Sequence, residues 1–502
     1  MYHRLLRIAT LSLLATPMFE VSAQFSGSIA PPSELIVGFD AITDKHAEDW
    51  LSILAGPGFE GRGTGQVGYT KAAHWVAGKA AEFGLEPMGD GGTYFQMLPM
   101  SRLSVEPTQS KMTGPKDLSI VFDKAIGLER FTNLPEVRGG VAFVCLSGES
   151  PKIDESVSLR DKIVFYTADE KAQGRAQGLI ARQRPVATFR IVNEEPKSGS
   201  QLQREGGRQR AASLSGTIST TAAAKIVSVF GGDASWTTLV DGDAKIFVAE
   251  GELKLELRYR EEPAAVPNVL AWQPGSDPDT RDEYIVIGAH LDHLGLQNGS
   301  LFPGADDNGS GSTALLNIAR AISANPIKPK RSVLCMWFAG EEIGLVGSAY
   351  YVDHPLLPLD KMICMLNVDM VGRNEEKQGE TASENETSIH LVGSKQGDLE
   401  LHEAIMKANQ YVNFAFEYDE EGVFGRSDQA NFFKKGTSVA FLFGGFHPDY
   451  HRPTDQVSKI NFHKIAAAAK LFYMTAHFAA DHGAFKIPKK PENGEAKAES
   501  SK

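Results

Sequence analysis

The chain has 502 residues, of which 42% are hydrophobic and 23% are charged, so it can bury a large core and is expected to hold two domains. Its formal net charge of −12 at pH 7 argues against a general affinity for nucleic acid or for anionic membranes. Only three cysteines are present, which indicates that disulfides do not hold the fold together.

The first 23 residues are typical of a secretory signal. Arg4 and Arg7 accompany an apolar stretch over residues 5–19, and Val21-Ser22-Ala23 follows in a small-residue cleavage context. No later run of the sequence is long and apolar enough to span a bilayer. We therefore expect residues 1–23 to be removed and the mature chain to be exported, to a periplasm, the cell exterior or a secretory lumen.

Residues 24–115 predict the first part of a domain that a second domain interrupts. Within it, residues 70–87 form an amphipathic helical pattern that ends at Gly84, with Pro87 just beyond. Over residues 116–250 the pattern changes to short strands, such as those expected at 140–146 and 161–167. This change indicates a β-rich insert.

The sequence pattern of the interrupted domain resumes over residues 251–485, and we expect these residues to complete that domain. Four short, continuous apolar runs in this part are typical of strands buried on both faces, at 284–289, 332–338, 362–368 and 438–443. Helical patterns alternate with them, at 311–323 and 398–412. The alternation predicts an α/β fold with a mostly parallel central sheet flanked by helices. Residues 486–502 are polar and predict a disordered tail.

Metal-binding side chains follow the ends of these predicted strands. They comprise two histidines and three carboxylates, namely His290, Asp307, Glu342, Asp369 and His451. In open α/β sheets, ligands bind outside the carboxyl ends of the strands. Two imidazoles with three carboxylates suit zinc-class ions, with cobalt or manganese as alternatives. A two-metal hydrolytic site also needs a bridging carboxylate, for which Asp307 is the candidate.

Five segments around these residues occur in the order typical of one family. They are HLDHLG (290–295), GADDNGSG (304–311), FAGEEIGLVGS (338–348), NVDMVGR (367–373) and PDYHRPTD (448–455). Together they resemble the co-catalytic di-zinc aminopeptidase family, which also contains glutamate carboxypeptidase and the transferrin receptor. The resemblance implies a zinc-dependent exopeptidase fold with two Zn²⁺ ions per chain. In relatives, the position of the insert holds a protease-associated domain.

The resemblance also assigns a role to each site residue. His290 and Asp369 would bind one metal, Glu342 and His451 the other, and Asp307 both. The resemblance further implies that Glu341 is the general base and that Tyr450 is the oxyanion donor. Asp292 and Asp455 would be the carboxylates that orient the ligand imidazoles. Neighbouring glutamates can differ in this way because side chains one residue apart in a loop diverge. The alternative for Glu341 and Glu342 is a solvated helix start.

Other polar residues near these motifs are less specific. For His293 we expect a hydrogen-bonded structural histidine rather than a ligand. Candidate substrate contacts are Arg426, Asp428 and His447. Many relatives carry a histidine where this chain has Gln429, so the contacts of that loop do not follow from the resemblance.

The sequence thus predicts an exported zinc exopeptidase, an aminopeptidase, that hydrolyses peptide substrates without a covalent intermediate. A metal-bridging water would attack and Glu341 would take its proton. One alternative is a carboxypeptidase or dipeptidase, for which Arg426 would bind the substrate carboxylate. The others are a glutaminyl cyclase, which uses one zinc, and a non-catalytic receptor-like binding protein. Residue specificity and oligomeric state stay open.

Overall fold

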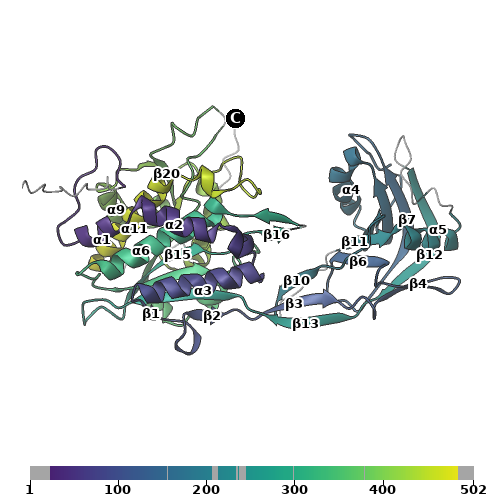
Figure 1. The fold of residues 1–502 in the computed structure, drawn as a ribbon, viewed down its shortest axis with the longest axis horizontal. Coiled ribbons are helices and arrows are strands. Elements are labelled where there is room, and N and C mark those ends of the chain that lie inside the picture. The colour runs from purple at the N-terminus through teal and green to yellow at the C-terminus, as the bar shows by residue number, and fades with distance from the viewer. Residues whose placement is uncertain are drawn as a thin grey trace, which may run out of the picture. The chain divides into compact units, whose positions relative to one another are not determined.

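The computed structural model describes residues 23–483 and 485, except 155, 206–212, 233–235, 237–244, 298 and 378. The tail predicted at 486–502 lies outside the described residues, as does the signal segment up to residue 22. The chain divides into two compact units (Figure 1). One unit comprises the residues up to Leu98 and those from Val266 onward, and the other is Pro99–Ala265. The second unit extends beyond both ends of the predicted insert, 116–250.

The first unit is built on a nine-stranded mixed sheet. Its strand order is β1-β14-β18-β15-β19-β22-β20-β21, and β2 also pairs with β14. The strands span β1 (Glu86–Pro87), β2 (Phe95–Met97), β14 (Pro267–Gln273), β15 (Tyr284–His290), β18 (Ser332–Phe338), β19 (Met362–Asp369), β20 (Ser388–Val392), β21 (Ala415–Glu417) and β22 (Val439–Phe443).

The prediction of a mostly parallel sheet is wrong for the sheet as a whole. The four predicted apolar runs form β15, β18, β19 and β22, which are mutually parallel. By contrast, β14 runs antiparallel to β18, and β20 antiparallel to β22. A strand buried on both faces has the same apolar composition in either direction, so the sequence pattern does not show which strands reverse.

Helices pack against this sheet from both parts of the first unit. The long C-terminal helix α11 contacts α6, α9 and α2, and α6 also contacts β15 and β19 (Figure 1). The predicted helical segments correspond to α3, α6 and α9. The helices span α1 (Ile36–Ala41), α2 (Asp44–Leu54), α3 (Val67–Glu82), α6 (Gly311–Ala324), α7 (Val346–Asp353), α8 (Ser394–Gly397), α9 (Leu399–Asn409), α10 (Gln429–Lys434) and α11 (Phe462–His482). A small hairpin, β16 (Gly295–Gln297) with β17 (Ser300–Phe302), follows β15.

The second unit contains an eight-stranded sheet in the order β5-β4-β12-β7-β8-β9-β11-β6 and a three-stranded sheet in the order β10-β3-β13. Its core includes the stacked rings of Phe143, Phe165 and Phe189. The elements span β3 (Met100–Val105), β4 (Lys111–Gly114), β5 (Leu118–Val121), β6 (Ile126–Arg130), β7 (Glu136–Leu146), β8 (Lys162–Ala168), α4 (Glu170–Arg182), β9 (Ala187–Val192), β10 (Ser200–Arg204), β11 (Leu214–Ser219), α5 (Thr220–Val229), β12 (Lys245–Glu256) and β13 (Tyr259–Ala264).

None of the described helices combines the length and the apolarity that a bilayer crossing requires.

Candidate metal centre

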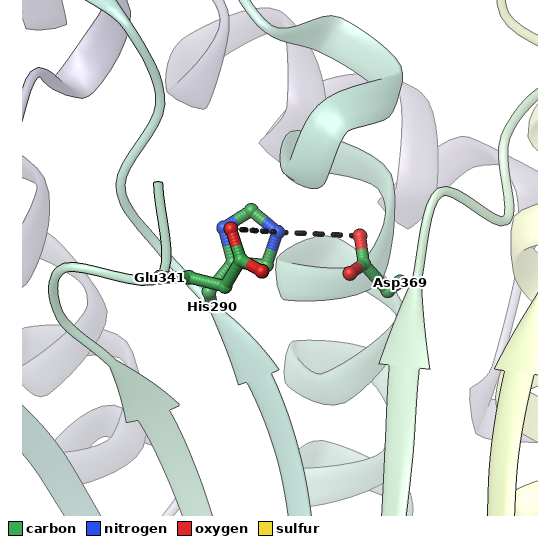
Figure 2. Close-up of side chains that lie close together, drawn as sticks. All are labelled: His290, Glu341 and Asp369. Atoms are coloured by element: carbon green, nitrogen blue, oxygen red, sulfur yellow. Dashed lines mark hydrogen bonds and ion pairs between the residues drawn. The ribbon is translucent and has the colours of Figure 1, made fainter. Parts of the chain in front are cut away.

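The parallel strands carry the predicted metal ligands at their carboxyl ends. His290 is the last residue of β15 and Asp369 the last of β19. Glu341 and Glu342 follow β18. The three strand ends bring the side chains of His290, Glu341 and Asp369 together (Figure 2). The loop before α6 supplies Asp307 and the loop after β22 supplies His451, at the edge of the sheet where α/β proteins bind ligands.

His290 is the centre of the first group of ligands. Its Nε2 lies 3.2 Å from Asp369 Oδ1, 3.4 Å from Asp307 Oδ1 and 3.9 Å from Glu341 Oε2. Figure 2 shows the Glu341 and Asp369 carboxylates pointing at this imidazole. Each of His290, Glu341 and Asp369 offers one atom within 4.8 Å of the others, which is a spacing that a metal ion can bridge.

His451 faces the other oxygen of Asp307. Its Nε2 lies 3.1 Å from Asp307 Oδ2 and 3.2 Å from Glu342 Oε2. Asp307 therefore directs Oδ1 toward His290 and Oδ2 toward His451. A carboxylate with its two oxygens toward two separate imidazoles has the arrangement that a bridging ligand requires.

His293 joins the second group, which the sequence did not indicate. Its Nδ1 lies 2.7 Å from Glu342 Oε1 and 3.7 Å from Asp307 Oδ2. The ring is buried, and its Nε2 has no hydrogen-bond partner among the described residues. The His293 imidazole therefore contacts two predicted metal ligands, Glu342 more closely than Asp307.

The electrostatics of the cluster favour a bound cation. Burial raises the pKa of Asp307 and that of Glu341, and neighbouring carboxylates raise both further. Although burial disfavours the imidazolium, the carboxylates of Asp369 and Glu341 raise the pKa of His290. Buried carboxylates this close together repel one another unless positive charge lies between them. The nitrogen and oxygen donors present fit zinc-class ions.

Asp292 holds His290 and Glu341 together. Its backbone carbonyl lies 3.1 Å from His290 Nδ1, as an acceptor for that ring nitrogen, while its carboxylate lies 3.8 Å from the same atom. The carboxylate accepts a hydrogen bond from the backbone N–H of Glu341 at 3.1 Å and another from the Thr64 hydroxyl. An N–H donated from Nδ1 leaves the His290 Nε2 lone pair available for a metal.

Asp455 contacts the Asp307 loop, although the resemblance assigns it to the imidazole of His451. Its carboxylate accepts hydrogen bonds from the backbone N–H of Asp306 at 3.0 Å and from that of Asp307 at 3.2 Å. Burial raises the pKa of Asp455 to about 6. The carboxylate thus fixes the backbone of the residue that faces both imidazoles.

Ser427 supports Asp369, and its role was not predicted. Its hydroxyl donates to Asp369 Oδ2 at 2.8 Å and accepts from Asn367 Nδ2 at 2.8 Å. Gln429 accepts from the same Asn367 amide at 2.8 Å and donates to the carbonyl of Phe424. Its side chain is therefore occupied in holding the loop.

A pocket opens onto His290, Asp307, Glu341 and Asp369. Its other lining residues are mostly apolar, namely Met370, Val423, Arg426, Ser427, Phe441, Phe443, Phe446 and Tyr450. Of the three predicted substrate contacts, Arg426 lies in this lining. Asp428 and His447 are buried outside it, where burial raises the pKa of Asp428 to about 7 and His447 Nε2 pairs with Asp306 Oδ2 at 3.2 Å.

Tyr450 stands between the pocket and His451. Its ring stacks on the His451 imidazole with centroids 3.9 Å apart. Its hydroxyl oxygen accepts a hydrogen bond from Arg426 Nη2 at 3.2 Å, and the Arg426 guanidinium lies over the Phe446 ring. The phenol proton is thereby left free to point into the pocket.

One family model matches the part of the chain that contains the site. The family model described as "Peptidase family M28" matches residues 268–476, a range that includes every predicted metal ligand. The predicted resemblance to the co-catalytic zinc exopeptidase family is therefore confirmed.

Similar proteins with curated descriptions include peptidases from several organisms. The chain is 33% identical over 195 residues to "Leupeptin-inactivating enzyme 1" of Streptomyces exfoliatus, covering 38% of each protein. It is 28% identical over 260 residues to "Aminopeptidase YwaD" of Bacillus subtilis, covering 50% of this chain and 51% of that protein. The chain thus spans about half the length, or less, of these relatives.

Two solved structures share the fold over most of their length. The aminopeptidase from Aneurinibacillus sp. strain AM-1 has a TM-score of 0.50 at 17% identity, over 92% of this chain and 99% of that one. A zinc aminopeptidase from Bacillus subtilis, BSAP, has a TM-score of 0.52 at 18% identity, over 89% and 96%. The mixed α/β fold is similar to that of these aminopeptidases.

Proposed function

We propose that this chain is a zinc aminopeptidase that releases the N-terminal residue of peptides. The observation that carries the proposal is the position of Asp307, whose two carboxylate oxygens face His290 and His451 separately. A single carboxylate between two imidazoles, with Glu341 beside it, is the arrangement of a two-metal hydrolase. The matched family and the relatives described as aminopeptidases support the same activity.

Two zinc-class ions would be held by five residues. His290 and Asp369 would bind one ion, Glu342 and His451 the other, and Asp307 both. When bound, such ions polarise the substrate carbonyl and acidify the attacking water. Cobalt or manganese could occupy the same donors.

Glu341 is the proposed general base. Burial raises the pKa of Glu341, which suits a carboxylate that takes a proton from water and then delivers it to the leaving amine. The Glu341 backbone is held by Asp292, so its carboxylate stays beside His290. No side chain needs to form a covalent bond with the substrate.

Tyr450 is the proposed donor to the oxyanion of the tetrahedral intermediate. Arg426 donates to the phenol oxygen, so the phenol must direct its own proton elsewhere, toward the pocket. Replacement by phenylalanine removes only this donor. We expect Tyr450→Phe to keep its metal content and to lose about 10²–10³ in kcat, as measured in parallel by metal analysis and steady-state kinetics.

The pocket supports a substrate with a large apolar N-terminal side chain. Met370, Val423 and three phenylalanines form most of its wall, while the carboxylates of Glu341 and Asp369 lie at the metal end. A free ammonium group fits beside these carboxylates. Arg426, which a carboxypeptidase would use for the substrate carboxylate, is already paired with Tyr450 and lies over Phe446.

Matched substrates test the proposal directly. The purified chain should hydrolyse leucine p-nitroanilide and leave N-acetyl-leucine p-nitroanilide intact, and it should contain about two zinc-class ions. Cleavage of N-blocked peptides alone would show the carboxypeptidase alternative. One retained ion together with cyclisation of N-terminal glutamine would show a glutaminyl cyclase. A protein that contains its metal ions and is inactive would show a receptor-like module.

Two further assignments rest on the sequence and are proposed with this function. Residues 1–23 would direct export, so N-terminal sequencing of the exported protein should begin at Gln24. Unit Pro99–Ala265 would be the protease-associated domain of the relatives, since it interrupts the first unit and is rich in strands. A crystal structure of the isolated unit that matches no protease-associated domain would contradict this assignment.

A further inference from the structure

A second cluster of metal-ligating side chains lies at the edge of the central sheet. It joins His390 on β20, Glu417 at the end of β21 and Glu375 in the segment between β19 and β20. Each offers one atom within 4.8 Å of the others. None of these residues belongs to the centre around Asp307, so the cluster needs its own explanation.

The hydrogen bonding of His390 leaves one ring nitrogen facing carboxylates. The imidazole is only 1% exposed, and its Nε2 lies 3.0 Å from Glu375 Oε2. An ionised carboxylate can only accept, so Nε2 carries the hydrogen. In the neutral ring, Nδ1 then holds a lone pair. That atom lies 3.1 Å from Asp419 Oδ1 and 3.8 Å from Glu417 Oε2, and within the described part of the chain it makes no hydrogen bond.

The local charge is strongly negative. Four carboxylates surround the ammonium group of Lys377, with oxygens 2.9 Å away for Glu375, 3.8 Å for Glu417, 2.9 Å for Asp419 and 3.9 Å for Glu420. Glu375 is only 2% exposed, so its charge is poorly screened by water. The ammonium of Lys377 and that of buried Lys464, which interacts electrostatically with Glu375 and Glu417, balance two of the four charges. A nitrogen lone pair between further carboxylate oxygens therefore calls for another cation.

We propose that Nδ1 of His390, Glu417 and Asp419 bind a divalent cation of the zinc class. Glu375 accepts the hydrogen bond from Nε2, which fixes the tautomer and strengthens the ligand, as second carboxylates do behind metal-binding histidines. One imidazole with two carboxylates suits zinc or manganese, whereas calcium prefers oxygen ligands alone. The Asp419 side chain is 61% exposed, so water can complete the coordination.

A cation at this place would connect the sheet edge with the wall of the substrate pocket. His390 pairs with Phe443 across β20 and β22, and the backbone N–H of Glu376 donates to the carbonyl of Phe446 at 3.1 Å. Phe443 and Phe446 both line the pocket. The ion would thus hold β20 and β21 next to the segment around Glu375 and Glu376, which contacts this wall. It would be a structural site without catalytic contacts.

The metal content of a matched pair of variants tests the proposal. After dialysis against zinc, the full chain should retain one ion more than His390→Gln, and His390→Gln should keep its peptidase activity. The same difference of one ion should persist when both proteins also carry Glu342→Gln. The comparison therefore stands even if the centre around Asp307 does not bind two ions. Equal metal content in the pair would overturn the proposal.

Lys377→Gln provides the second arm, because the Lys377 ammonium competes with the cation for Asp419. Its removal should tighten zinc binding at this site about fivefold, as measured by titration of zinc into the variant. Zinc should also raise the melting temperature of Lys377→Gln, and not that of the double variant with His390→Gln. If the cluster is only an ion-pair network around Lys377, this variant would be less stable and zinc would restore nothing, which would also overturn the proposal.

Discussion

Glu341 and Glu342 are neighbours that face different groups. Glu342 directs Oε1 toward His293 at 2.7 Å and Oε2 toward His451 at 3.2 Å, so both of its oxygens are engaged. Glu341 lies farther from an imidazole, at 3.9 Å from His290 Nε2. This difference in contacts supports the proposed roles of Glu342 as a metal ligand and of Glu341 as the base.

Exchange of each glutamate for glutamine separates the two roles. Glu341→Gln keeps the shape of the side chain and removes the base, so its metal content should persist while kcat falls by about 10²–10⁴-fold. Glu342→Gln should lose metal at the His451 position, and added zinc should partly restore activity. Metal analysis beside kinetics distinguishes them. Metal loss in Glu341→Gln, with both ions kept in Glu342→Gln, would reverse the assignment.

The two imidazoles near Glu342 should also behave differently. His451 has a side chain 37% exposed and contacts Asp307 and Glu342 equally closely, whereas buried His293 approaches Glu342 alone within hydrogen-bond distance. His451→Gln should therefore lose one ion. His293→Gln should keep both and bind the second about 10–100-fold more weakly, as expected for a residue that orients a ligand. Zinc titration with a competing chelator measures this, and the opposite order would make His293 the ligand.

Some of these side-chain roles could be predicted from the sequence, and others could not. Of the proposed ligands, His290 and Asp369 end strands, and Glu342 and His451 come after strands, so the pattern of apolar runs places these four at one edge of the sheet. The orientation of the His293 ring depends on a residue elsewhere in the sequence, Gly304. A side chain on Gly304 would lie 2.4 Å from the His293 ring, so this glycine leaves the space that lets the ring turn toward Glu342. Ser427 likewise reaches Asp369 only through the packing of its loop.

At the level of elements, buried Arg62 connects the segments that carry the site. It donates to four backbone carbonyls, those of Leu54 at 2.7 Å, Leu291 at 2.9 Å, Pro303 at 2.9 Å and Gly304 at 2.7 Å. These carbonyls belong to the end of α2, the segment after β15 and the loop that leads to Asp307. Burial lowers the pKa of Arg62 to about 10, so it stays charged at neutral pH.

Arg62→Lys should break this connection while it keeps the charge. A lysine has three donors and no planar fork, so at least one buried carbonyl would lose its partner. The cost of each lost bond is about 1–3 kcal/mol, and zinc affinity should fall with it because the loop before Asp307 loosens. Urea unfolding and zinc titration measure the two effects. An unchanged unfolding midpoint would show that Arg62 is not needed for this packing.

We expect buried His477 in α11 to make the first unit sensitive to acid. The ring is buried against Tyr473, and burial lowers the pKa of His477 to about 4 from an ordinary value of 6.5. Between these values the unfolded chain binds a proton that the folded chain does not, so stability is lost as pH falls through this range. His477→Phe should recover roughly 2 kcal/mol between pH 7 and pH 4.5 relative to the wild type. Urea unfolding at both pH values tests this, and parallel pH profiles would refute it.

The strands and helices that position the site were predictable because each is long and regular in its apolar pattern. The directions of β14 and β20 were not, since strand direction depends on the connections. The segment between β19 and β20, for example, is long enough to return the chain either way. The cluster of Glu375, His390 and Glu417 depends on the same connections, because its three residues come from separate elements.

At the level of the whole molecule, the chain leaves the first unit after Leu98 and returns to it at Val266, which is a neighbour of Leu98 in space. Leu98 donates its backbone N–H to the carbonyl of Val266 at 3.1 Å. Just before and after it, β2 and β14 pair antiparallel, with Met97 opposite Pro267. The ends that remain when Pro99–Ala265 is removed are therefore already placed as the two arms of a hairpin.

Replacement of residues 99–265 by Asn-Gly should give a folded first unit. The dipeptide favours the two-residue turn that joins antiparallel strands, and every proposed metal ligand lies in the remaining residues. The product should bind zinc in the same amount as the full chain and hydrolyse leucine p-nitroanilide. A replacement limited to residues 118–248 is the matched control. It cuts β12 and removes β10, which leaves β3 and β13 without the rest of their unit, so this shorter deletion should aggregate. If the shorter deletion folded and the longer one did not, the boundary between the units would lie inside Pro99–Ala265 and not at its ends.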